Sequence, residues 1–317
     1  MKNAVTVFFL LIFAACQQAP EPAAASLAMA TAQAESPVKQ STDPAFARFA
    51  DYWFAGEAEI STYELAQARY GEIHQGEAAL VFVTEPFSKS KQVKLDNPAT
   101  RDKVDVLKLN MTKKFFTGVY PYSMMMSAFK PVDMKKALSS LKVATSSQEW
   151  CGHTFTQYNL SGKQYEVKQF SYFESEGDMS LKLPATFMED DIWTQIRLNP
   201  GLLPTGQFEM IPGSMYSRLS HREIAAETVR AERSDLGNGL SNYIVKFPNQ
   251  RSLSITFQST FPYSIETWQE TYLSGFGSNA RELTTIATLK KRIKLDYWNH
   301  NGLSDSEYRD KLELKSW

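Results

Sequence analysis

The 317-residue sequence has few cysteines and almost no net charge, and each shortage excludes a class of protein. Its two cysteines, Cys16 and Cys151, are too few for the several disulfides of a small secreted scaffold. Its 34 lysines and arginines face 35 aspartates and glutamates, so no positive excess is available to neutralise nucleic-acid phosphates. We therefore expect no nucleic-acid partner.

Common catalytic and metal-binding motifs are also missing. The chain has no Gly-x-Ser-x-Gly, the turn that presents a hydrolase serine. It has no His-Glu-x-x-His, no Cys-x-x-Cys and no Asp-rich calcium loop. The histidines are scattered singly along the chain: His74, His153, His221 and His300. The sequence therefore predicts neither a metal site nor a bound cofactor.

Residues 1–16 (MKNAVTVFFLLIFAAC) have the organisation of a bacterial lipoprotein signal peptide. Lys2 supplies a positive start, and the apolar stretch after it is too short to span a bilayer. Two small alanines precede Cys16, as a signal peptidase requires. We expect Cys16 to receive a diacylglyceryl group and to become the first residue of the mature chain. The alternative is an ordinary cleaved signal that a cysteine follows by chance.

Residues 17–42 are rich in alanine, proline, glutamine and serine and lack aromatic side chains. Such a composition buries too little apolar surface to order itself, so we expect a flexible tether to a folded body at 43–317. Several acyl chains, at about 0.8 kcal/mol per buried methylene, make an almost permanent anchor. Gln17 favours the outer membrane, and we expect the body to face the periplasm.

The body alternates apolar and polar residues as antiparallel strands do. In Arg251–Gln258 and in Leu289–Tyr297 the alternation predicts one face in the core and one in water. Leu80–Val83 is apolar throughout and is expected at the centre of the sheet. A phase slip near Phe170 in Gln164–Glu174 predicts a bulge. We expect a mainly β fold of ten to twelve strands, an antiparallel meander that forms a strongly curved sheet or a half-open barrel.

Turns and a few short helices separate the predicted strands, and no long helix lies between strands as a βαβ fold would need. Hairpin turns are expected at Gln75-Gly76, Ser161-Gly162 and Asn238-Gly239. Helices are expected after Asp43-Pro44, from a capping box over Thr186–Glu189 as far as Asn199-Pro200-Gly201, and after Ser304.

The second of these helices lies mid-chain, where it would divide two β halves near 186–200. A weak repeat supports the division, because Tyr120–Ser123 (YPYS) returns as Phe261–Ser264 (FPYS). Similar stretches of four residues also arise by chance in β-rich chains. A duplicated body and an undivided body therefore both stay open.

Cys151 and His153 are weak candidates for catalysis, because residues two apart share one face of a strand. An imidazole beside a thiol can take its proton and leave the thiolate that a cysteine nucleophile needs. No third group that would orient the imidazole is recognisable nearby. A lone cysteine is commonly a small buried apolar side chain, and we favour that structural interpretation of Cys151.

Two further runs suggest chemistry but have a simpler structural interpretation. Met124–Met126 resembles a set of copper ligands, yet neighbouring residues of a strand point to opposite faces, so we expect core filling. Gly275–Asn279 lacks the lysine and the following helix of a phosphate-binding loop, so we expect a turn.

Charged residues on predicted strands are interpreted in the same way. Glu57 and Glu59 share a strand face, with Arg69 on a neighbouring segment, and we expect this face to be solvated. The basic run Lys290–Lys294 is expected on a wet face, with contact to anionic lipid or lipopolysaccharide as the alternative.

Six segments of the body are distinctive when taken together: Phe54–Ile60, Gln67–Glu72, Val83–Phe87, Tyr120–Ser123, Glu149–His153 and Gly275–Ala280. Over residues 46–300 they resemble a family of bacterial lipoproteins of unknown function, some of which carry the label septum formation inhibitor Maf. The resemblance implies a lipoprotein and brings no established catalytic residues. Maf pyrophosphatases begin with Ser-x-Ser-Pro-Arg-Arg, a run that this chain does not contain.

Three functions of different classes follow. We prefer an outer-membrane-anchored module that binds a lipid, a glycan or an envelope protein, or that assists envelope assembly, with residues 120–130 and 261–276 lining its site. The first alternative is an envelope hydrolase or thiol enzyme that uses Cys151 and His153. The second is a purely structural lipoprotein. In each case the membrane is a partner through the acyl chains on Cys16.

Overall fold

The computed structural model describes residues 44–315, so the predicted signal peptide, the Cys16 lipidation site and the predicted tether lie outside the described residues. The strands are β1 Ala58–Arg69, β2 Glu72–Ser88, β3 Lys103–Thr117, β4 Tyr120–Pro131, β5 Lys142–Glu149, β6 Gly152–Ser161, β7 Gln164–Ser171, β8 Met179–Pro184, β9 Phe187–Met188, β10 Gly206–Ile211, β11 Glu227–Gly237, β12 Leu240–Lys246, β13 Ser252–Gln258, β14 Ile265–Ser274 and β15 Arg281–Leu295. The helices are α1 Pro44–Trp53, α2 Asp191–Leu198, α3 Ser214–Leu219 and α4 Glu307–Lys311, with short 3₁₀ helices at η1 Pro200–Leu202, η2 Gly277–Asn279, η3 Tyr297–Asn299 and η4 Leu303–Ser306. Within the described range, no helix is both long enough and apolar enough to cross a membrane.

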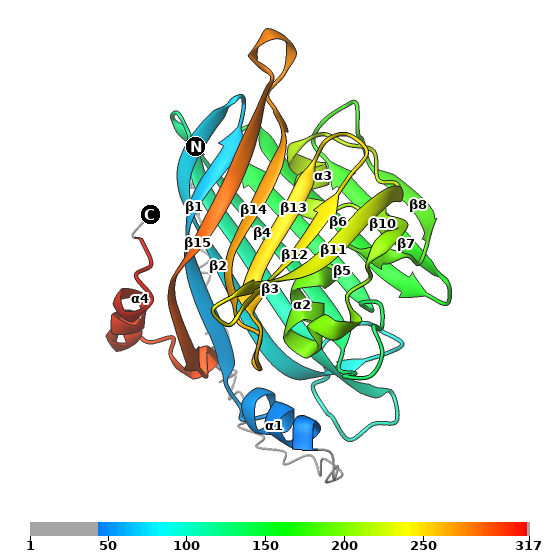
Figure 1. Ribbon diagram of the computed structural model, residues 1–317, viewed down its shortest axis with the longest axis vertical. Helices are drawn as coiled ribbons and strands as arrows, with labels where there is room; N and C mark the ends of the chain where they lie inside the picture. Colours follow the sequence, from blue (N-terminus) through cyan, green and yellow to red (C-terminus); the bar gives the residue numbers. More distant parts are fainter. Residues whose placement is uncertain (1–43, 316–317) are drawn as a thin grey trace, which may run out of the picture. The chain divides into compact units, whose positions relative to one another are not determined.

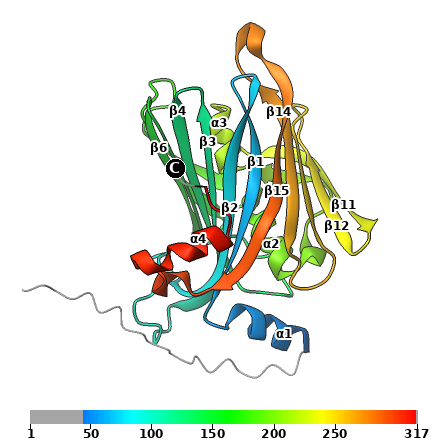
Figure 2. The same ribbon diagram turned by 90° about the vertical axis from the view of Figure 1, so that its left-hand side faces the viewer.

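All fifteen strands belong to one curved sheet, in the order β8-β7-β6-β5-β4-β3-β2-β1-β15-β14-β13-β12-β11-β10-β9. Neighbours are antiparallel except β9 and β10, which run parallel over two residues. The sheet bends so that its two halves face each other, and its edge strands β8 and β9 do not pair (Figures 1 and 2). The prediction of an antiparallel half-open barrel with a few short helices is confirmed, with more strands than expected.

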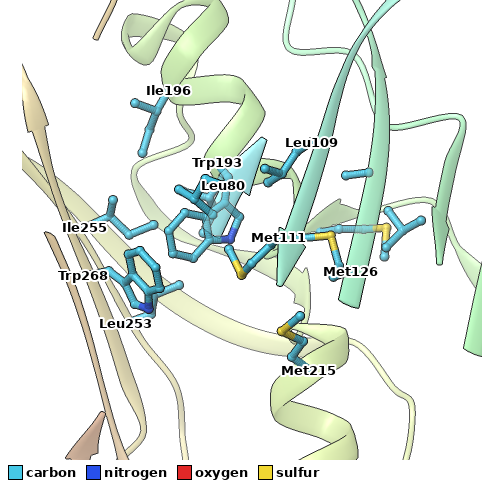
Figure 3. Packing of buried hydrophobic residues seen from close by; sticks show 14 of the residues in the cluster. Leu80, Leu109, Met111, Met126, Trp193, Ile196, Met215, Leu253, Ile255 and Trp268 are labelled. Atoms are coloured by element: carbon cyan, nitrogen blue, oxygen red, sulfur yellow. The ribbon is translucent and has the colours of Figure 1, made fainter. Parts of the chain in front are cut away.

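Two short helices fill the space between the facing halves. All eight residues of α2 are buried, and Figure 2 shows α2 and α3 between the two halves of the sheet. Trp193 of α2 meets Trp268 of β14 edge-on, with ring centroids 5.1 Å apart, and Met111 and Met126 approach from the opposite wall (Figure 3). The interior of the half-barrel is therefore a packed core.

The helix predictions are partly confirmed. Helix α1 begins at Pro44, as expected, and α2 ends at Leu198, where the side chain of Asn199 accepts a hydrogen bond from the Gly201 amide. The prediction that a capping box over Thr186–Glu189 starts this helix is wrong, because Phe187–Met188 forms strand β9 and α2 begins only at Asp191. Pairing with β10 competes with the local helix signal there and prevails.

Strand β15 differs from its prediction because it contains a bulge. Tyr63 of β1 pairs with Leu289, while Thr62 pairs with Lys291, so Lys290 is an extra residue. Leu289 consequently packs against the main core, whereas Ile293 packs in a separate cluster on the outer face. The predicted single apolar face over Leu289–Tyr297 is therefore wrong. The outer cluster is covered by the C-terminal segment through Leu312.

Other local predictions had mixed outcomes. The alternation of β13 and the central position of Leu80–Val83 in the sheet are confirmed, as are the turns at Ser161-Gly162 and Asn238-Gly239. No bulge interrupts β7, whose pairing with β6 is continuous past Phe170. Gly76 lies inside β2, where a Cβ would stand 2.4 Å from a backbone oxygen of β3; close cross-strand approach, and not a turn, requires this glycine.

The first eight strands form one half of the sheet and the last seven form the other. The chain passes between the halves from β8 to β9, just before α2, and the described residues belong to one compact unit. The repeated tetrapeptide falls on different elements, since Tyr120–Ser123 begins β4 and Phe261–Ser264 lies between β13 and β14. Duplication of the halves stays a prediction.

Candidate functional site

One end of the half-barrel collects exposed apolar side chains. Because the strands form a meander, the β1–β2, β3–β4, β5–β6, β7–β8 and β14–β15 turns all lie at this end, and α1 lies at the other (Figure 1). Eight of the fifteen large apolar side chains that are exposed among residues 44–315 lie here. We call these eight the rim: Ile73, Phe116, Val119, Trp150, Phe170, Tyr172, Leu273 and Phe276.

The most exposed rim rings continue into a chain of aromatic contacts. The Trp150 ring, 69% exposed, stacks on Tyr120 with centroids 6.3 Å apart and 29° between the planes. The other contacts at this end, by centroid distance, are Tyr70–Phe276 at 6.4 Å, Phe276–His221 at 6.0 Å, His221–Phe173 at 5.2 Å and Phe173–Tyr172 at 5.5 Å. Other aromatic side chains thus support three of the rim rings, Trp150, Tyr172 and Phe276.

The predicted turn at Gly275–Asn279 is confirmed, and it helps to build the rim. A Cβ at Gly71, where φ is +79°, would stand 2.3 Å from the carbonyl oxygen of Asn279. The β14–β15 loop therefore packs on the β1–β2 turn only because Gly71 has no side chain. This contact brings Phe276 to Tyr70.

Arg69 lies beneath the rim, at the end of β1, with 6% of its surface exposed. Its Nη1 donates to the carbonyl oxygen of Leu219, and its Nη2 lies 3.2 Å from the hydroxyl oxygens of both Tyr70 and Tyr122. Its buried Nε has no hydrogen-bond partner among the described residues, and no described carboxylate forms an ion pair with Arg69. A buried guanidinium whose charge no carboxylate balances is costly.

The tyrosines around Arg69 act as neutral hydroxyls. Burial raises the pKa of Tyr122 and of Tyr70, so both keep their protons at neutral pH. Their oxygens lie 2.7 Å apart, and Tyr120 donates to Tyr70 at 3.2 Å. This network orients the guanidinium without neutralising it.

A small cavity of about 10 Å³ opens beside Arg69, which is room for about one water molecule. We call it the Arg69 cleft; it is lined by Arg69, Tyr122, Ser147, Glu149, Gly152, Thr154, Phe173, Arg218 and Leu219. An adjacent cavity of about 20 Å³ shares Arg218. Arg218 forms an ion pair with Glu176, which also binds His221 Nδ1 at 2.7 Å.

The structure does not place the side chains of the predicted catalytic pair, Cys151 and His153, in contact. Cys151 is exposed in the turn before β6, so its interpretation as a buried side chain is wrong, and His153 is exposed within β6. No hydrogen bond joins the two among the described residues. Hydrogen bonding to Glu149, together with its charge, raises the pKa of the Cys151 thiol and disfavours the thiolate.

The predicted solvated carboxylate face is also wrong. Glu59 is fully buried and forms a bidentate ion pair with Arg197 of α2, while Glu57 pairs with Lys294 at 3.2 Å. Arg69 lies on the same strand as Glu59, at its opposite end.

The side chains of the basic run Lys290–Lys294 do not share one solvent-exposed face of the strand. The bulge at Lys290 turns Arg292 inward, where its Nε lies 3.6 Å from Glu59. The interpretation of Met124–Met126 as core filling is confirmed, since Met124 and Met126 are buried and Met125 faces outward.

The predicted lining segments reach the site only at their ends. In 120–130, Tyr120 and Tyr122 belong to the site, whereas the inward side chains beyond them pack in the core. In 261–276, Leu273 and Phe276 belong to the rim. Sequence reasoning missed Arg69 as the centre of the site, although the adjacent arginine and tyrosine at a turn offered a signal.

Comparison with known proteins identifies no family for this chain. No family model and no curated protein matches it. Among solved structures, the chain is similar to the crystal structure of a beta-barrel-like protein of a domain of unknown function, DUF1849, from Brucella abortus. The identity is 8%, with 76% of this chain and 98% of that chain covered and a TM-score of 0.43.

Proposed function

We propose that this protein is a lipid-anchored lipoprotein of the bacterial outer membrane, and that its body binds an envelope ligand at the rim. The observation that carries the proposal is the concentration of exposed rings beside the Arg69 cleft. Binding sites combine aromatic surface with a few convergent polar groups, and large exposed apolar patches commonly mark them. The signal-peptide pattern ending at Cys16 supports the anchor.

The packed interior supports a ligand bound at the surface. The cavities at this end hold about one water each, so an acyl chain would have to displace the core to enter there. A carrier that encloses a lipid is therefore a poorer fit to the described residues.

The position of the rim supports a partner other than the anchoring bilayer. The described body begins with α1 at the end opposite the rim, and the twelve residues of β1 connect the two ends over about 40 Å. A body held by its N-terminal end presents the rim away from that attachment. Glycans and proteins of the periplasm are then the accessible partners.

Two variants test the two halves of this proposal. Cys16→Ser should move the protein from the membrane fraction to the soluble fraction, because it removes the acylated thiol. The rim variant Trp150→Ala/Phe276→Ala should weaken retention of the full chain by immobilised peptidoglycan at least about tenfold.

The matched control is Leu236→Ala/Leu303→Ala, which removes exposed apolar side chains away from the rim. The control should bind like the wild type. Equal retention of the rim variant and the control would refute the rim as the binding surface. Membrane association that survives Cys16→Ser would refute the anchor.

A further inference from the structure

We propose that the carboxylate or phosphate group of a saccharide binds at the opening of the Arg69 cleft, with the sugar ring stacked on the rim. The inference rests on the proposed function and deepens it, because it assigns a ligand chemistry to the same surface. Two features of the described residues support it, the charge of the cleft and the shape of the rim, and the position of Glu149 provides a test.

The lining of the cleft has more positive than negative groups. Its nine residues include two guanidinium groups, Arg69 and Arg218, and one carboxylate, Glu149. Glu176 balances Arg218 from outside the cleft lining, but Arg69 binds only a carbonyl oxygen and phenol hydroxyls. An acid group at the cleft would supply the counter-charge that Arg69 lacks, through the strong hydrogen bonds that guanidinium forms with carboxylate or phosphate.

Hydroxyl groups extend this recognition. Ser147 and Thr154 lie in the lining with Tyr122, so donors other than the two arginines surround the opening. Gly152 leaves room there, since a Cβ at this position would stand 2.5 Å from the Tyr172 ring. Tyr172 can consequently lie close against the turn that borders the cleft.

The shape of the rim suits a ring-shaped ligand better than a peptide. Strands end in turns here, so the rim offers no sheet edge to which a peptide could add as a strand. Peptide side chains that anchor an interface need pockets, and the cavities beside the rim are too small for one. A sugar ring instead presents flat C–H faces to exposed rings such as Trp150.

Glu149 should limit the affinity of this subsite. Its carboxylate accepts a hydrogen bond from the Cys151 amide at 2.7 Å and lines the same cleft. A negative charge there opposes a bound acid group. Glu149→Gln should therefore tighten binding of an acidic saccharide more than binding of a neutral one.

Calorimetric titration of the full chain with matched probes tests the inference: glucose, glucuronate, glucose 6-phosphate and inorganic phosphate, at constant ionic strength. Both acidic sugars should bind at least about tenfold more tightly than glucose. Arg69→Gln should remove most of this preference, and Arg69→Lys should restore part of it. The exposed Arg230→Gln serves as the control and should behave like the wild type.

The wild-type titrations decide the outcome even where an Arg69 variant fails to fold. Equal affinity for glucose and glucuronate would overturn the inference and leave the rim as a binding surface. Inorganic phosphate that binds as tightly as glucose 6-phosphate would overturn the role of the sugar ring. If neither acidic sugar binds, the inference fails, and retention of the Trp150→Ala/Phe276→Ala variant then decides the proposed function separately.

Discussion

Glu59→Gln is expected to destabilise the protein strongly, because it leaves a buried guanidinium without its counter-charge. Arg197 donates from Nη1 and Nη2 to the two carboxylate oxygens of Glu59 at 2.5 and 2.6 Å. Both side chains are at most 1% exposed, and the guanidinium also lies 5.0 Å from the centre of the Trp53 ring. Arg292, 3.6 Å from Glu59, adds a second positive charge.

The magnitude follows from burial. Removing one partner of a buried ion pair costs about 3–5 kcal/mol, which is a large share of the roughly 5–15 kcal/mol that stabilises a folded domain. At about 2 °C per kcal/mol for a body of this size, the melting temperature should fall by about 6–10 °C. The double variant Glu59→Gln/Arg197→Met should lose less than the sum of the two single variants, because neither charge is then left alone.

Thermal and urea unfolding of wild type, single and double variants measure these losses. The exposed pair of Glu166 and Lys182 gives the control, and Glu166→Gln should cost under about 1 kcal/mol. An unfolding midpoint for Glu59→Gln equal to that of the wild type would show that the charge of Glu59 does not balance Arg197. Additive losses in the double variant would contradict the pairing.

The pH dependence supplies a second test of the same pair. Burial alone would raise the pKa of Glu59, but the charge and hydrogen bonds of Arg197 outweigh burial and lower it. Stability from this carboxylate is then fully present above the unfolded pKa of about 4.3 and is lost as the pH falls through the folded value. The advantage of wild type over Glu59→Gln should therefore shrink below about pH 4.

Three further predictions concern other parts of the body. Burial and the charge of Glu189 raise the pKa of Asp190 to about 7. Between about pH 4 and 7 the folded protein therefore holds a proton that the unfolded chain has released, so stability should fall as the pH rises through this range. Asp190→Asn should remove that fall in urea unfolding at pH 5 and pH 8, and parallel profiles for the two proteins would contradict it. Glu149→Gln should speed alkylation of the exposed Cys151 near pH 8 by lowering the thiol pKa, and an unchanged rate would mean that Glu149 does not act on the thiol. Gly76→Ala should cost about 1–3 kcal/mol in thermal unfolding, because the added methyl group meets the backbone of β3, and an unchanged melting temperature would refute that close approach.

Local patterns in the sequence determined the fold class of this protein. Period-two alternation predicted β13, and the Asn238-Gly239 pair predicted the hairpin between β11 and β12, where both residues have positive φ. Proline at the start of α1 and the sequence after Leu198 predicted where two helices begin and end. These signals succeed because each depends on residues a few positions apart.

Only the tertiary structure decided the candidate site and the charged interior. Glu59 and Arg197 are 138 residues apart, and Arg69 binds Leu219 across 150 residues, so no local pattern relates either pair. The bulge in β15 turned Arg292 toward the interior, although the alternation of the sequence predicted a solvent-exposed side chain. The curvature of the sheet brought Tyr70, Tyr120 and Tyr122 together around Arg69. Alternation predicts which side chains share a face of a strand, whereas strand order, register and curvature determine what that face meets.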